Sequence, residues 1–326
     1  MKRRAFCRKV GAVALLGAAS LHAQAPRVLR LAWISGDRKD APSANLDAFR
    51  SGLRDLGYVE NRNVVIDVWA GDGAAERIEA MAGDVVRSRP DIVVAAGGLA
   101  LFALLRARVE LPIVFSISAD PVEARIVDSF ARPGGNVTGI SLFTLALVGK
   151  RMELIKEVVP NAKRVAVLAN TQHPGERHEI AAAQEGARRA GLALRYFPVT
   201  SAAQLDAALA DIARARDDAV LAFADGFMMG FAERIAAFSL RERIPTVDGW
   251  APFAAAGNLM IYGPVLDDVY RRLATYVDRI ARGAKPGDLP VELPIKIEFV
   301  VNAKTARALG IALPASVLTR ADRVIR

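Results

Sequence analysis

The alternation of short apolar runs with helical patterns restricts the fold of this chain more than any other feature. Between residues 28 and 115, four apolar runs are separated by stretches in which apolar residues recur every three or four positions. The runs cover residues 28–34, 64–69, 91–95 and 111–115. Strands that alternate with helices in this way form parallel sheets, and the helices cover both faces of each sheet.

A second series begins at residue 163 and repeats this order. Its apolar runs cover residues 164–169, 192–199, 218–223 and 244–248, with helical patterns at 176–190, 201–214 and 227–241 between them. A stretch at 132–139 that contains Pro and two adjacent Gly residues separates the two series, and we expect a turn and a crossing there. The repeated order predicts two doubly wound parallel α/β lobes.

Further elements follow the second series. The patterns predict a strand at 257–262, a helix at 267–282 that Gly283 ends, a strand at 296–301 and a helix at 303–309. These elements predict that the chain returns between the lobes.

Residues 1–23 have the layout of a secretory signal peptide. Five basic residues at positions 2–9 precede an apolar stretch at 10–20, and the small residues Ala23 and Ala25 follow. This stretch is too short to cross a bilayer, which takes about 20 residues, and it has no polar face that would favour an uncleaved amphipathic helix. We expect cleavage after Ala23 or after Ala25 and export to the periplasm. The general secretory and twin-arginine routes both remain open.

The charge of the chain changes when this segment is removed. The 326 residues include 44 Lys and Arg against 35 Asp and Glu, a formal charge of +9. Five of the basic residues lie within positions 1–23, which leaves a mature chain of 39 against 35. A small net charge and an aromatic content of 6% do not indicate a nucleic-acid partner. Cys7, the only cysteine, is removed as well, which excludes disulfides and multi-cysteine zinc sites.

No catalytic or cofactor-binding motif is evident in the sequence. It lacks the phosphate loop G-x-x-x-x-G-K-[ST], the nucleophile elbow G-x-S-x-G and the dinucleotide fingerprint G-x-G-x-x-G. His173 and His178 are five positions apart, whereas a zinc-binding helix needs four, and we expect both on the surface. We therefore expect no cofactor, no metal and no enzymatic activity.

Residues with binding chemistry lie where the expected strands end. In doubly wound sheets, ligands bind beyond the carboxyl ends of the strands. Glycines there allow close approach of the backbone, and N–H groups at helix starts suit a carboxylate. The alternative is that the Gly and Asp residues only form turns and caps. The candidate binding residues are Ser35, Gly97, Gly98, Ser118, Asp120, Asn170, Asp225, Trp250 and Tyr262.

The stretch Arg-Pro-Gly-Gly-Asn-Val-Thr-Gly at 132–139 is the most specific of several motifs, and others lie at 49–60, 150–160 and 255–264. With these motifs the chain resembles the ABC-transporter substrate-binding family that includes tryptophan- and tyrosine-type binding proteins. The resemblance extends over nearly the whole chain. The chain departs from the family pattern at 117–119 and 170–174, both in the expected pocket, so its solute can differ from those of better-known members.

The resemblance implies a type I periplasmic binding protein fold with three crossings between the lobes. Lobe 1 would comprise residues 24–138 and 258–290, and lobe 2 residues 139–257 and 291–326. A small carboxylate-bearing solute, such as an aromatic amino acid, would bind between them, and hinge closure would precede delivery to a membrane permease. If the solute is an amino acid, Asp120 or Asp225 would pair with its ammonium group. We expect a monomer.

Two other classes of protein remain open. A periplasmic sensor would pass its closed form to a signalling partner instead of a permease. An exported α/β enzyme would need a nucleophile or an acid–base pair, and the sequence offers only isolated Asp and Ser residues at loop tips. Turnover of the bound solute would favour the enzyme, and neighbouring permease and ATPase genes would favour the transporter.

Overall fold

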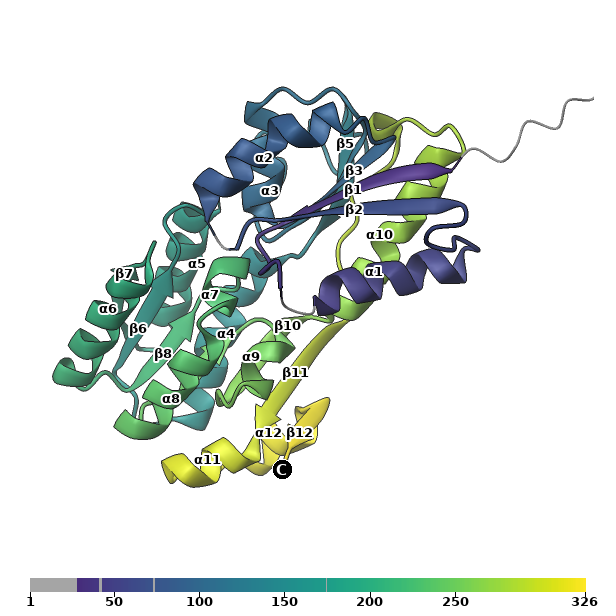
Figure 1. The fold of residues 1–326 in the computed structure, drawn as a ribbon. Helices are drawn as coiled ribbons and strands as arrows, with labels where there is room; N and C mark the ends of the chain where they lie inside the picture. The colour runs from purple at the N-terminus through teal and green to yellow at the C-terminus, as the bar shows by residue number, and fades with distance from the viewer. Residues whose placement is uncertain (1–27, 41–42, 73, 174) are drawn as a thin grey trace, which may run out of the picture.

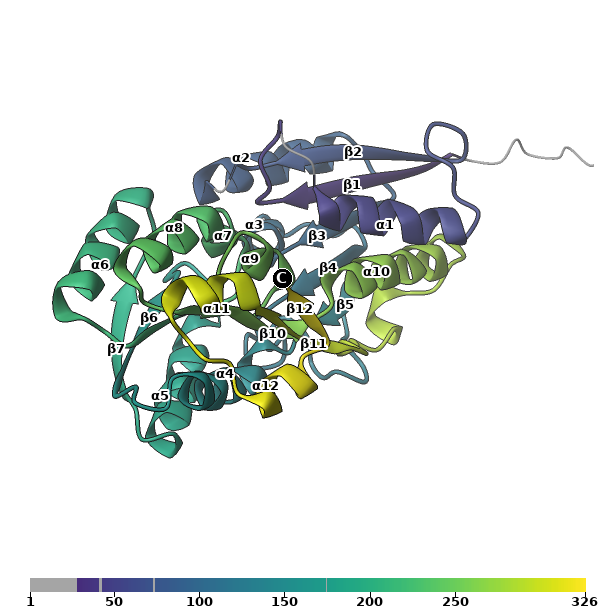
Figure 2. The same ribbon diagram turned by 90° about the horizontal axis from the view of Figure 1, so that it is seen from below.

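The computed structural model describes residues 28–40, 43–72, 74–173 and 175–326 (Figure 1). The expected signal peptide, both cleavage points and Cys7 lie outside the described residues. The described chain forms two lobes, each built on one sheet with helices on both faces (Figures 1 and 2). None of the described helices is both long enough and apolar enough to cross a membrane.

Lobe 1 is built on a five-stranded parallel sheet in the order β2-β1-β3-β4-β5. Its strands are β1 (Leu29–Ser35), β2 (Val64–Ala70), β3 (Ile92–Ala96), β4 (Ile113–Ile117) and β5 (Val137–Ser141). Its helical elements are α1 (Ala44–Asp55), α2 (Ala75–Arg87), α3 (Gly98–Arg106), α10 (Leu266–Ala281) and the 3₁₀ turn η1 (Pro286–Asp288). Successive side chains of β1 alternate between the faces, because Leu31 and Trp33 pack with α1 and α10 whereas Ala32 and Ile34 pack with α2 and α3.

Helices α1 and α10 lie side by side on one face of this sheet, although they come from opposite ends of the chain (Figures 1 and 2). Their apolar residues belong to one core cluster. Gly52 permits the close approach, since a β-carbon there would overlap the carbonyl oxygen of Arg271. The hydroxyl of Tyr58 also donates to Asp278 Oδ1 at 3.0 Å, across 220 positions of sequence. Lobe 1 is therefore completed by a helix from the last fifth of the chain.

Lobe 2 is built on a seven-stranded sheet in the order β12-β11-β10-β9-β8-β6-β7, in which only β10 and β11 pair antiparallel. Its strands are β6 (Arg164–Ala169), β7 (Ala193–Pro198), β8 (Ala219–Ala222), β9 (Thr246–Asp248), β10 (Met260–Pro264), β11 (Ile297–Asn302) and β12 (Arg323–Ile325). Its helices are α4 (Thr144–Val158), α5 (Glu176–Arg189), α6 (Ala202–Ala215), α7 (Gly226–Met229), α8 (Ala232–Glu242), α9 (Ala251–Ala255), α11 (Ala303–Leu309) and α12 (Ala315–Arg320).

The two sheets share one strand order. The first four strands of lobe 1 lie as β2-β1-β3-β4, and the first four of lobe 2 lie as β7-β6-β8-β9. The prediction of two doubly wound parallel lobes is thus confirmed, with one antiparallel pair added in lobe 2. Within the described residues the chain passes between the lobes three times, at 142–143, at Val265 and at 293–296.

Several boundaries differ from those predicted. The turn at 132–139 ends at Asn136, and Val137 starts β5, which pairs with β4 before the chain crosses. Strand β10 pairs with β9 and β11, so residues 260–264 belong to the sheet of lobe 2, whereas the sequence placed 258–290 in lobe 1. Helix α4 was not predicted, because its buried face includes the polar residues Thr144 and Arg151, which interrupt the apolar stripe. The helix expected at 227–241 is two helices that part at Gly230.

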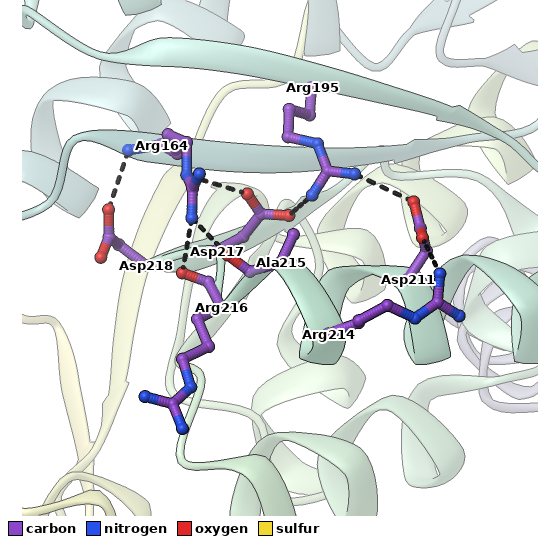
Figure 3. Close-up of polar contacts among 8 residues, drawn as sticks. All are labelled: Arg164, Arg195, Asp211, Arg214, Ala215, Arg216, Asp217 and Asp218. Atoms are coloured by element: carbon purple, nitrogen blue, oxygen red, sulfur yellow. Dashed lines mark hydrogen bonds and ion pairs between the residues drawn. The ribbon is translucent and has the colours of Figure 1, made fainter.

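An ion-pair network closes the base of lobe 2, where α6 leads into β8 (Figure 3). The fully buried carboxylate of Asp217 lies 2.5 Å from Nη1 of Arg195 and 3.5 Å from Nε of Arg164. Asp218 Oδ2 accepts the backbone N–H groups of Lys163 and Arg164. These contacts join the start of β6 to β7 and to the α6–β8 turn. They fix the end of the sheet that lies away from the candidate site.

Candidate functional site

A cavity of about 70 Å³ lies between the lobes, at the carboxyl ends of the strands. Both sheets reverse their strand order at this point, between β1 and β3 in lobe 1 and between β6 and β8 in lobe 2. The segments after such strands diverge to opposite faces of the sheet and leave a crevice. The two crevices face each other, so that residues of both lobes line one cavity.

Six of the nine predicted binding residues line the cavity, namely Gly97, Gly98, Ser118, Asn170, Asp225 and Trp250. The other three lie outside its lining. Ser35 is buried at the end of β1, where its Oγ accepts the N–H of Asp37 at 3.3 Å. Asp120 caps the turn that follows it by accepting two backbone N–H groups. Tyr262 packs edge-on against Phe299 within lobe 2.

The start of α3 forms the lobe 1 side of the cavity. Gly97 has a φ of 102°, a left-handed conformation that side chains disfavour, and it turns the chain from β3 directly into α3. No side chain caps this helix, and its first-turn N–H groups have no carbonyl partner within the helix. Gly98 and Leu99 of this first turn line the cavity. The helix start therefore offers N–H donors and the positive end of the helix dipole to an anionic group.

A carboxylate forms part of the lobe 2 side. Asp225 is the N-cap of α7, and its Oδ1 accepts the N–H of Met228 at 2.6 Å. Burial raises the pKa of Asp225 to about 6, although hydrogen bonds from Met228 and Asn170 oppose the rise. The carboxylate is thus held in a site where a cationic partner would stabilise its charged form.

Aromatic and aliphatic side chains complete the cavity wall. Trp250 joins the core cluster of lobe 1 although it belongs to lobe 2, and its buried Nε1–H has no hydrogen-bond partner among the described residues. Phe227 and Tyr270 line the same cavity. Tyr270 lies on α10, where its hydroxyl accepts from Ser116 Oγ at 3.0 Å. An unpaired buried donor beside aromatic rings suits a ligand that carries both an acceptor and an apolar part.

Some residues of the cavity were not predicted. Tyr270 forms part of an ordinary apolar stripe on α10, and nothing in the sequence separates it from core residues. The other lining residues absent from the prediction include Gly36, Asp37, Asn45, Leu99, Leu142, His173 and Phe227. Of these, Gly36, Asp37, Leu99 and Phe227 lie within the segments that follow predicted strand ends, and this position is the sequence signal for them.

The expectation that His173 lies on the surface is wrong. Its side chain is 7% exposed, and Nε2 hydrogen-bonds to Ser118 Oγ of the other lobe. The ring is buried because the lobe 1 loop that carries Ser118 covers it. His178 has a 53% exposed side chain, as expected.

A cluster of buried charges lies in lobe 2 close to the cavity. Arg151 is fully buried and donates through Nε to the carbonyl of Tyr262 at 2.8 Å. It faces Asp248 and Glu179, and burial raises the pKa of Asp248 to about 7 and that of Glu179 to about 8. Asp248 Oδ1 accepts the N–H of Trp250 at 2.9 Å and so fixes the turn that carries this side chain to the cavity. The described residues include no group of three or more His, Cys, Asp or Glu side chains placed to hold a metal.

Comparison with known proteins adds independent evidence. The sequence model of the family described as ABC transporter substrate binding protein matches residues 31–325. The tyrosine-binding protein of Clostridioides difficile strain R20291 is 23% identical over 261 residues, which make up 80% of this chain and 75% of that protein.

Two solved structures share the fold along their full length. The ABC domain in complex with L-Trp from Streptococcus pneumonia has a TM-score of 0.84 and 24% identity, and the match covers 91% of this chain and 100% of that one. A conserved domain protein from Vibrio cholerae o1 biovar eltor has a TM-score of 0.83 and 27% identity over 92% and 100% of the two chains.

Proposed function

The chain belongs to the ABC transporter substrate-binding protein family, and we propose that it captures an aromatic amino acid between its lobes and delivers it to a membrane permease. One observation carries the choice of an amino acid. The cavity has an unpaired helix start on lobe 1 and a buried carboxylate, that of Asp225, on lobe 2. These two features are complementary to the carboxylate and the ammonium group of a zwitterion.

In this proposal the solute carboxylate receives hydrogen bonds from the first turn of α3, at Gly98 and Leu99. The Nε1–H of Trp250 supplies a further donor, because it is buried and unpaired among the described residues. Asp225 pairs with the solute ammonium, and Asn170 orients the carboxylate through a side-chain hydrogen bond. Hydrogen bonds between charged groups in such a dry site are stronger than those between neutral groups.

The aromatic character of the solute is proposed from the walls and from the relatives. Phe227, Trp250 and Tyr270 bring three rings to one small cavity. The named relative from Clostridioides difficile is a tyrosine-binding protein, and the pneumococcal structure holds L-Trp. Because the cavity lies between the lobes, a solute would enter it when the lobes separate. The predicted residues Ser35, Asp120 and Tyr262 would support the site without touching the solute.

Closure of the two lobes around the solute would link solute capture to delivery to the permease. A solute that binds both lobes favours the closed form by its additional contacts there, and the permease would recognise that form. We further propose that residues 1–23 direct the chain to the periplasm, are cleaved, and leave a monomer. Its role would be that of a binding protein without turnover, since the family is one of solute carriers.

A thermal-shift screen of the twenty amino acids and a set of organic acids tests this function. A solute at 100 times its Kd should stabilise the protein by about 2.7 kcal/mol and raise the Tm. We expect L-tryptophan, L-tyrosine or a related amino acid to give the largest shift, with calorimetry to confirm one site. If no amino acid shifts the Tm while a different small solute does, the proposed solute class is wrong.

A further inference from the structure

Two loops, one from each lobe, face each other along one flank of the cavity. The lobe 1 loop follows β4, and the lobe 2 loop joins β6 to α5. They meet where Ser118 pairs with His173 and Ala119 with Gly175, and the contact continues where Glu123 pairs with His178 in the first turn of α5. Only the first of these pairs is a buried hydrogen bond between side chains.

The direction of this bond follows from the other nitrogen of the ring. His173 Nδ1 accepts the backbone N–H of Gly175 at 3.2 Å. A neutral imidazole that accepts at Nδ1 carries its proton on Nε2. Burial lowers the pKa of His173 to about 4, so the ring is neutral at physiological pH. Nε2–H therefore donates across the lobes to Ser118 Oγ.

Ser118, His173 and Glu179 resemble a Ser-His-acid triad in the order of their side chains, but the proton of His173 is on the other ring nitrogen. In a triad, Nδ1–H faces the carboxylate and Nε2 accepts the serine proton. Here Nδ1 is an acceptor, and Glu179 Oε2 lies 3.7 Å from it, beyond hydrogen-bond distance. A ring that resists protonation is also a poor general base. The geometry suits a structural bond between lobes better than an activated nucleophile.

We propose that the Ser118–His173 hydrogen bond is a latch, meaning a bond between lobes whose making and breaking sets the balance of open and closed forms. The proposal rests on the solute-binding function, since opening and closing matter only if a solute enters. The carbonyl of Ser118 accepts a hydrogen bond from Thr144 Oγ1 at the start of α4. Thr144 directly follows the crossing at 142–143, so the latch lies beside one of the segments that join the lobes. Gly175 lets the loops close fully, because a β-carbon there would lie 3.1 Å from Cβ of Ala119.

The test measures the distance between the lobes. Spin labels at V86C on α2 and L240C on α8, both exposed positions, are placed in a full chain in which Cys7 is replaced by Ser. Double electron–electron resonance then gives the distance distribution without solute and with L-tryptophan or L-tyrosine. The variants are S118A and H173L, which remove the bond, and G175V, which wedges the loops apart. H173Q is the matched control, since its side-chain amide can donate in place of Nε2–H.

We expect S118A, H173L and G175V to shift the solute-free distribution to longer distances, while H173Q resembles the wild type. Amino-acid Kd values should rise about 3- to 10-fold in S118A and H173L, the effect of one net hydrogen bond. Wild-type distance distributions in S118A and H173L would overturn the latch, even if their affinity falls through a lost solute contact. If the wild type binds neither amino acid and the distributions still shift, the latch stands and the proposed solute class fails.

Discussion

The guanidinium of Arg151 lies directly against the backbone of Gly249, so that a β-carbon at position 249 would overlap Nη2. The guanidinium has little freedom to retreat, because Nε is bonded to the carbonyl of Tyr262 on the neighbouring strand β10. Gly249 also stands between Asp248 and Trp250, in the turn that forms the cavity wall. This contact joins the buried charge cluster to the solute site.

Replacing Gly249 by Ala should therefore destabilise the protein and weaken solute binding together. Overpacking of a dense interior costs about 1–3 kcal/mol, and the strain would displace Trp250 from the cavity wall. Chemical denaturation and calorimetry measure the two effects. Gly149→Ala on α4 is the matched control, since a β-carbon there meets nothing within 4 Å and should be neutral or stabilising. Equal behaviour of the two variants would contradict this view of the contact.

Asp225→Asn should abolish most of the affinity for an amino acid and leave the fold intact. Asn is as good an N-cap as Asp, so α7 keeps its start, whereas the charge that pairs with the solute ammonium is lost. Losing a charged hydrogen bond costs about 1.5–3 kcal/mol, which raises the Kd by about 10- to 150-fold. Asp206→Asn on the surface of the same lobe should leave the Kd unchanged.

Amino-acid affinity should fall as the pH drops through 6. The pKa of Asp225 is about 6 in the solute-free protein, and only the ionised carboxylate pairs with an ammonium group. Protonation of this one group makes the Kd about tenfold larger at pH 5 than at pH 7. Glu179 titrates higher, at about 8, and is mostly protonated through this range, whereas Asp248, at about 7, becomes mostly protonated only below pH 7. Calorimetry at several pH values should show the decline in the wild type, and any binding left in Asp225→Asn should lack it.

Glu179→Gln should stabilise the protein at pH 8 and have a much smaller effect at pH 5. Burial raises the pKa of Glu179 from 4.5 to about 8, and the charge of Arg151 only partly opposes this. Such an acid takes up a proton on folding between the two pKa values, so its contribution to the free energy of unfolding falls as the pH rises from about 4.5 to about 8.

Chemical denaturation of Glu179→Gln and of the wild type at pH 5 and pH 8 measures this difference in the free energy of unfolding. Glu153→Gln, an exposed change on α4, is the control and should be nearly neutral at both. A Gln variant less stable than the wild type at pH 8 would show that ionised Glu179 pairs productively with Arg151.

Local signals were sufficient to predict most of the fold. Strands such as β6 are continuous apolar runs because both faces are buried, and Ser201 marks the start of α6 because its side chain accepts the N–H of Gln204. Strand β5 was missed because Gly139 interrupts its apolar run. The boundary at 258 was misplaced because nothing local shows that β10 pairs with β9 before the chain crosses.

The sequence predicted those residues of the candidate cavity whose place near a strand end is enough to locate them. Gly97 and Asn170 directly follow β3 and β6, Asp225 lies shortly after β8, and the parallel topology brings these strand ends together. Tyr270 and His173 could not be found this way. Tyr270 reaches the cavity from a helix near the end of the sequence, and His173 is buried only because a loop of the other lobe covers it. Contacts between residues far apart in the sequence leave no local pattern in either partner.

The packing of α1 against α10 has a consequence for the order in which this protein acquires its structure. A chain made from its N-terminus exposes the apolar face of residues 44–55 until residues 266–281 have also emerged. Lobe 1, although first in sequence, therefore cannot bury the face of its sheet that α1 covers until most of lobe 2 has been synthesised. Completion of lobe 1 must therefore wait for α10, which leaves an interval in which this apolar face of the nascent chain is open to chaperones or to a translocation machinery.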